Sequence, residues 1–170
     1  MIYPIIVYEY HRFGDEREEY KFSRTYKQFE EDLKTTFDWL VFDDGYQSQI
    51  KACEMARQLN IRVKLAIITS WIGKPNYLTK EEIKELSKYH DIENHTHHHK
   101  VLTELPDDLI EKEIKWGNKV ITEIIGRIPR YLICPHNQVN NNVREIANKL
   151  GLVVLEDRTT IYNDTNITNI

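Results

Sequence analysis

Two short segments, far apart in the chain, carry the side chains best suited to chemistry. In the first, Asp43 and Asp44 follow the apolar run Trp39–Phe42. In the second, His95 and His99 lie one helical turn apart within a segment rich in histidine. One carboxylate and two imidazoles suit zinc or a similar divalent cation, and the second carboxylate is left to handle a proton.

The adjacent aspartates are expected to play different roles. Neighbouring residues of an extended chain direct their side chains to different sides, so Asp43 and Asp44 cannot easily bind one cation in the same manner. One would bind it while the other takes a proton from water, and Gly45 allows an unusual backbone angle at the turn. Without a cation, the pair would be solvated loop acids or the N-cap of a helix beginning near Tyr46.

The histidine segment permits a shared ligand position. His95 and His99 can direct their rings to one point if the segment coils, and Thr96 can cap or orient that turn. His97 and His98 are expected to lie outside the ligand set, next to it or exposed. The alternative is a fortuitous cluster on the surface.

The elements that position these residues alternate along the chain. Apolar runs typical of buried strands lie near residues 3–9, 38–43, 61–68, 90–94, 131–135 and 152–156. Capping boxes and helical spacing predict helices after Thr25 and Thr79, over Ile50–Leu59, from Pro106 to Ile125 and over Asn142–Leu150. Such alternation predicts a mainly parallel sheet, open or closed as a barrel. Functional groups gather at the carboxyl ends of such strands, where we expect Asp43, Asp44, His95 and His136.

Composition limits the alternatives. We expect one domain over residues 1–170, which is long enough to bury a core. The net charge of -4, with basic residues scattered among acids, argues against a nucleic-acid partner. The N-terminal segment lacks the features of a signal peptide and is too short to span a membrane, so we expect no membrane contact and a cytoplasmic location.

The two motifs resemble those of a known family. Phe42–Gly45 and His95–His99 are similar to the first two motifs of the NodB-type polysaccharide deacetylases, metal-dependent enzymes of carbohydrate esterase family 4. The resemblance covers nearly the whole chain. Tyr10–Phe13 is similar to the Tyr-His opening of many members, Leu102–Leu105 to the segment after the histidine motif, and Pro129–Asn137 to the third, proline-rich motif.

The resemblance implies an irregular or incomplete (β/α) barrel that hydrolyses the N-acetyl group of an amino sugar or oligosaccharide and releases acetate. It implies that Asp43 is the general base and that the metal ligands are Asp44, His95 and His99. It also implies that the main-chain N–H of His136 helps to hold the oxyanion. Zinc is the expected metal, with cobalt, nickel and iron as alternatives.

The chain departs from the family in three places, and in one of them Asn137 replaces the usual glycine of the third motif. Ile133 or Cys134 takes the position of the arginine that orients the base, for which Arg130 is a candidate substitute. The family's last motifs, which supply the acid for the leaving amine, have no counterpart here, so a C-terminally truncated variant is expected. His11 or His136 would then serve as the acid.

Three alternatives therefore stay open at the level of the sequence. One is a catalytically weak relative that binds metal or carbohydrate, and another is a hydrolase of a small non-sugar amide. The third concerns assembly, because an incomplete barrel exposes a sheet edge that a second copy could cover in a homodimer.

Overall fold

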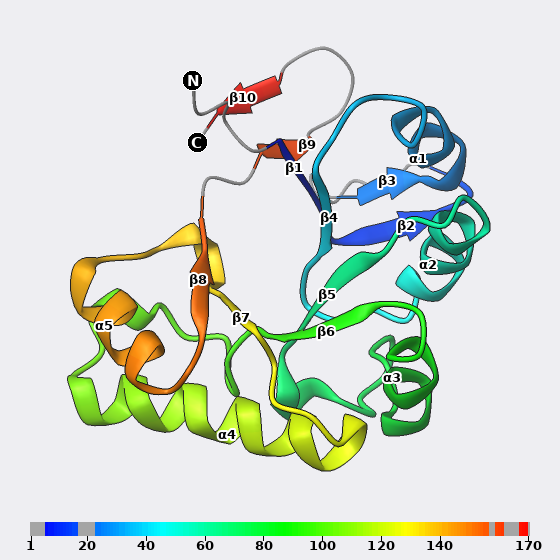
Figure 1. Cartoon of the computed structure of the whole chain (residues 1–170). Helices are drawn as coiled ribbons and strands as arrows, with labels where there is room; N and C mark the ends of the chain where they lie inside the picture. The colour runs from blue at the N-terminus through cyan, green and yellow to red at the C-terminus, as the bar shows by residue number, and fades with distance from the viewer. Residues whose placement is uncertain (1–5, 17–22, 157–158, 162–166, 170) are drawn as a thin grey trace.

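One curved sheet runs through the molecule, with the helices arranged around its outside (Figure 1). This computed structural model describes residues 6–16, 23–156, 159–161 and 167–169. Six parallel strands form its main part, in the order β1 (Val7–Tyr10), β4 (Trp39–Phe42), β5 (Val63–Ile67), β6 (Asp91–Asn94), β7 (Tyr131–Ile133) and β8 (Val153–Leu155). On the other side of β1, β9 (Thr159–Ile161) adds in parallel, and β10 (Ile167–Asn169) pairs antiparallel with β9.

The sheet stays open, with β8 and β10 as its outer strands among the described residues. Six parallel strands that curve without closing form a half-barrel, so the expected incomplete (β/α) barrel is confirmed. All six expected strands are present, although the first begins at Val7 and residues 1–5 lie outside the described residues. Four strands of only three residues were not expected, since so short a run shows little alternation. They are β9, β10, β2 (Arg12–Gly14) and β3 (Ser23–Thr25). Of these, β2 and β3 pair with each other in a small parallel sheet.

In the described part of the chain, five α-helices cover the outer face of the sheet. They are α1 (Tyr26–Asp32), α2 (Gln49–Gln58), α3 (Lys80–Leu86), α4 (Asp107–Ile125) and α5 (Asn141–Lys149). The capping boxes of Thr25 and Thr79 are both formed, and α4 ends at Gly126 with a left-handed φ of 75°. The predicted helix over Ile50–Leu59 is α2, and Leu59 is its C-cap residue, 56% exposed. No helix in the described ranges is long and apolar enough to cross a bilayer.

The alternation of side chains along each strand separates two apolar layers. On β4, Leu40 and Phe42 pack outward with the helices, whereas Val41 faces the inside of the curve. The inner layer consists of Val7, Val41, Ala66, Tyr131, Ile133 and Leu155. Because the period along a strand is two residues, the next inward position on β4 falls at Asp43. The same register aims polar residues inward just beyond the last apolar layer.

Candidate metal centre

Asp44, His95 and His99 come together at the carboxyl ends of β4 and β6. Their ligand atoms all lie within 4.8 Å of one another. Oδ1 of Asp44 is 3.4 Å from Nε2 of His95 and 3.5 Å from Nε2 of His99. This oxygen is buried, makes no hydrogen bond and lies near two imidazole nitrogens. Such an arrangement fits the donor set of a divalent cation.

The backbone turns sharply to place Asp44 in this group. Asp44 has a left-handed φ of 72°, and Gly45 follows with φ 76°. A side chain at Gly45 would also crowd Ile67, whose Cδ1 would lie 3.0 Å from the added Cβ. Asp43 precedes the turn and keeps the inward direction of the strand, with its Oδ2 3.9 Å from Nε2 of His95. The two carboxylates therefore differ in position, one inside the group and one beside it.

The two rings were expected to meet if the segment coils, and His95–His99 instead forms a bend. Thr96 and His99 both have left-handed φ values, of 66° and 60°. The Oγ1 of Thr96 accepts a hydrogen bond from the N–H of His99 at 3.0 Å, which closes the bend. Oδ1 of Asn94 accepts one from the N–H of Thr96 at 2.7 Å. The two rings thus converge by a different route, with their Nε2 atoms 3.2 Å apart.

The protonation states of Asp44 and His99 suit metal ligands. Nδ1 of His95 lies 2.6 Å from the carbonyl oxygen of Ile133, so it carries the proton and leaves Nε2 to face Asp44. Burial raises the pKa of Asp44, but the adjacent imidazole of His95, 3.4 Å from Oδ1, outweighs burial and lowers that pKa to about 2. Burial lowers the pKa of His99 to about 4, with His95 adding to the effect. Near neutral pH, Asp44 is therefore an anion and His99 a neutral base.

His97 and His98 lie outside this group, as expected. Nδ1 of His97 is 2.8 Å from Oγ1 of Thr69. The buried carboxylate of Glu113 accepts a hydrogen bond from the main-chain N–H of His98 and contacts its Nδ1, both at 2.7 Å. These contacts anchor the bend without involving the ligand atoms.

A second polar group, which the sequence did not reveal, adjoins the first. Glu9, His11 and Asp43 each offer a ligand atom within 4.8 Å of the others. Glu9 in β1 and His11 just after it follow Val7 at two-residue intervals, so the period of a strand could have located them. Gln49, fully buried, donates from Nε2 to the carbonyl oxygens of Asp43 and His11 at 2.5 and 2.8 Å. It fixes the carboxyl ends of β1 and β4 together.

The third motif reaches the same edge of the sheet. His136 has a left-handed φ of 57°, and its exposed ring lies 4.8 Å from that of His99. Arg130 does not replace the family's arginine. It precedes β7 at the opposite end of the strand, with its guanidinium over the ring of Tyr131. Ile133 is buried at the carboxyl end.

An open α/β half-barrel with a candidate Asp-His-His metal centre and a neighbouring carboxylate defines the class of this protein. The polysaccharide deacetylase profile matches residues 30–155, more than half of the chain, and the protein belongs to this family.

Known proteins agree with this assignment. The chain is 29% identical over 135 residues to chitin deacetylase 1 of Cryptococcus neoformans var. grubii, a match that covers 75% of the chain and 28% of that protein's length. It therefore spans less than a third of this curated relative. Deacetylase PplD of Streptococcus pyogenes, solved with acetate, superposes with a TM-score of 0.83 at 17% identity, covering 94% of this chain and 93% of PplD. BC0361, a polysaccharide deacetylase from Bacillus cereus, gives 0.82 at 17% identity, covering 96% of this chain and 66% of that protein. At this identity the two structures show the fold.

Proposed function

We propose that this protein hydrolyses the N-acetyl group of an amino sugar or oligosaccharide and releases acetate, with a divalent cation bound by Asp44, His95 and His99. One observation carries the proposal. The buried Oδ1 of Asp44 lacks a hydrogen bond and faces two imidazole nitrogens, and the separate carboxylate of Asp43 lies alongside. Zinc suits one carboxylate and two imidazoles, although cobalt, nickel and iron accept the same donors.

Asp43 is the proposed general base. It is only 2% exposed, and its carboxylate lies within reach of a water molecule placed beside Asp44 and His95. When bound, the cation would supply a Lewis acid for the acetamide carbonyl and acidify water. Asp43 then takes the proton as water attacks, and the main-chain N–H of His136 helps to hold the oxyanion. Collapse releases acetate and a free amine.

The leaving amine needs a proton, and the structure favours His11 over His136 as its source. The imidazole of His11 lies next to Asp43 and Glu9 on the inner side of the sheet. His136 is exposed and contacts His99. His11 is therefore the better placed of the two to exchange protons with the base.

The test measures bound metal and acetate release from N-acetylglucosamine oligomers. Asp43→Asn should keep the metal and lose at least about a hundredfold in kcat, whereas Asp44→Asn should lose the metal as well. Asp108→Asn, on the exposed face of α4, is the matched control and should behave like the wild type. Stoichiometric zinc binding without turnover on any acetylated sugar would reject the proposal and leave the fold intact.

A second candidate function is a binding module with weak catalysis. Two observations favour it: buried Ile133 and Cys134 stand where the family has an arginine, and Arg130 is too far along β7 to help. The base would then lack its usual partner. Equal sugar affinity in the wild type and Asp43→Asn, with no turnover in either, would favour this function.

A further inference from the structure

Residues 69–78 connect the two loops that carry the proposed metal ligands. The main-chain N–H of Ser70 donates to the carbonyl oxygen of His97 at 3.0 Å, which fixes the start of the segment to the histidine bend. The N–H of Leu78 donates to the carbonyl oxygen of Gly45 at 2.9 Å, which fixes its end to the aspartate turn. Side chains carried by this segment are therefore held at the border of the candidate metal centre.

Trp71 and Tyr77 meet on this segment because the chain between them folds back. The N–H of Lys74 donates to the carbonyl oxygen of Trp71, and the N–H of Tyr77 donates to that of Lys74, both at 3.0 Å. Asn76 has a left-handed φ of 69°, a conformation that asparagine adopts more readily than most residues. The centroids of the Trp71 and Tyr77 rings then lie 5.0 Å apart.

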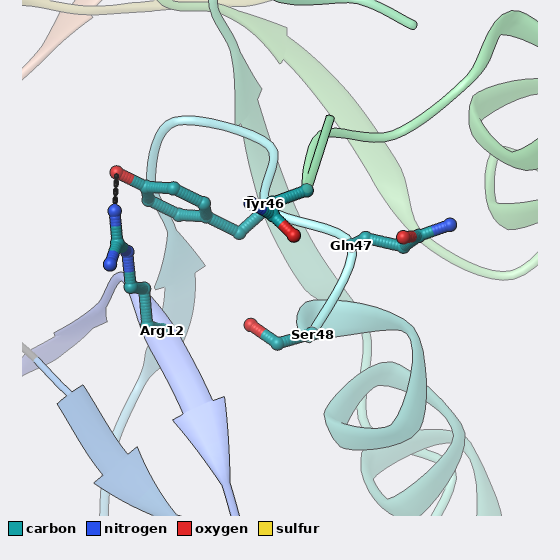
Figure 2. Close-up of a pocket in the computed structure, with 5 residues that line it drawn as sticks. Arg12, Tyr46, Gln47 and Ser48 are labelled. Carbon is teal, nitrogen blue, oxygen red and sulfur yellow. Dashed lines mark hydrogen bonds between the residues drawn. The ribbon is translucent and has the colours of Figure 1, made fainter. Parts of the chain in front are cut away.

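A buried ring supports this pair. Tyr46, which is only 6% exposed, stacks on Tyr77 with centroids 4.8 Å apart and 26° between the ring planes. The hydroxyl of Tyr46 accepts a hydrogen bond from Nη2 of Arg12 at 3.3 Å (Figure 2). Tyr77 therefore links Trp71 to the interior, and a ring whose position is set by packing costs a ligand little in lost freedom.

Trp71 borders the metal centre itself. Its ring lies 5.5 Å from that of His99, with 50° between the two planes. Trp71 and Tyr77 are both partly exposed, whereas the proposed ligands Asp44 and His95 are buried. Beside His99, the border of the centre is therefore an accessible aromatic ring and not a charged group.

An aromatic ring at this place suits a sugar. In a β-linked N-acetylglucosamine chain the ring substituents are equatorial, so each unit presents C–H groups on both of its faces. A tryptophan ring can bury such a face from water without losing much side-chain freedom of its own. Because Trp71 contacts a proposed ligand, a chain with one unit at the cation has its neighbouring unit within reach of this ring.

We propose that Trp71, supported by Tyr77, packs against the sugar unit next to the one that is deacetylated, so that the substrate is an oligosaccharide of at least two units. The proposal rests on the proposed function, because it names the substrate class of the same site. It makes Trp71 a residue that determines specificity and takes no part in proton transfer.

The experiment compares substrates that differ in the number of sugar units. They are the methyl β-glycoside of N-acetylglucosamine and the β-1,4-linked dimer and trimer of N-acetylglucosamine. The wild type should show a kcat/KM about tenfold to a hundredfold higher for the dimer than for the single unit. Equal values for the single unit and the dimer would overturn the proposal.

Trp71→Ala should lower kcat/KM for the dimer by about the same factor and so remove the difference between the dimer and the single unit. An equal loss on both substrates would show that Trp71 only supports His99, which would overturn the proposal. Trp116→Ala is the matched control, since Trp116 is 47% exposed on α4 and contacts His97 outside the ligand set, and it should keep the difference. If circular dichroism shows that Trp71→Ala does not fold, Trp71→Leu keeps apolar volume without the ring and takes its place, with the same expected outcomes.

A binding measurement separates this proposal from the proposed hydrolysis. Calorimetric titration with the dimer compares zinc-loaded Asp43→Asn with the double variant that also carries Trp71→Ala, and it needs no turnover. Dimer binding that is about tenfold weaker in the double variant supports the proposal even if the wild type hydrolyses no substrate. Hydrolysis of the dimer by the wild type, with equal dimer affinity in the two variants, would overturn the proposal and keep the proposed function.

Discussion

Gly117, in the middle of α4, touches the side chain that supports the histidine bend. A methyl group at this position would lie 2.3 Å from Oδ1 of Asn94, far inside contact distance. Asn94 is fully buried. Its Nδ2 donates to Ile114 O at 2.9 Å and to Asn118 Oδ1 at 2.7 Å, and its Oδ1 accepts the N–H of Thr96 at 2.7 Å. We therefore expect Gly117→Ala to displace Asn94 and loosen the bend.

The sign of the effect distinguishes this contact from helix propensity. In an exposed helix, replacing glycine by alanine stabilises by about 1 kcal/mol. Here the three hydrogen bonds of Asn94 are lost at about 1 kcal/mol each, and overpacking adds about 1–3 kcal/mol. The expected net result for Gly117→Ala is a loss of about 3–5 kcal/mol in the free energy of unfolding. Zinc affinity should also fall by about tenfold or more, since groups that orient metal ligands have effects of this size.

Urea unfolding of four proteins tests this expectation: the wild type, Gly117→Ala, Asn94→Ala and the double variant. Once Asn94 is truncated, the methyl group at position 117 has space, so Gly117→Ala should be neutral or slightly stabilising in that background. The cycle then yields a coupling energy of about 3 kcal/mol or more between the two positions. If Gly117→Ala stabilises the otherwise unchanged protein, the reasoning is refuted.

Three further predictions concern the supports of the fold and the site. Burial lowers the pKa of His90, whose Nδ1 accepts a hydrogen bond from the N–H of Val63. The neutral imidazole therefore stabilises the fold fully above the ordinary pKa of 6.5, and this stabilisation is lost as the pH falls below 6.5. Urea unfolding at about pH 7 and about pH 5 should show a slope of up to about 1.4 kcal/mol per pH unit that His90→Gln lacks. Glu113→Ala removes both anchors of His98 and should weaken zinc binding by about tenfold or more in a competition titration, and unchanged affinity would contradict that role. Thr79→Ala removes the capping box of α3 and should cost about 1 kcal/mol by thermal unfolding, with acetate release unaffected.

The sequence was sufficient for the six strands of the main parallel sheet and for the edge at which the site lies. Runs such as Trp39–Phe42 are apolar on both faces, because inner and outer layers are both buried, and parallel strands bring their carboxyl ends to one edge. The approach of Asp44 to the imidazoles could not be derived in the same way. It depends on a left-handed backbone at Asp44, which only Gly45 hinted at, and on a bend at Thr96 where the spacing suggested a helical turn.

Contacts between distant elements could not be predicted from the sequence for a different reason. The pairing of Gly117 with Asn94 joins α4 to β6, and a glycine within a helical pattern gives no sign of what it packs against. Glu9 and His11, in contrast, lay within reach. Once Val7 is placed in the inner apolar layer, the two-residue period directs the side chains of Glu9 and His11 to the same side of the sheet. Parallel pairing sets Tyr10 of β1 beside Phe42 of β4, so the residues that follow them, His11 and Asp43, are neighbours. The charged inner positions at the strand ends therefore follow from the same alternation that builds the core.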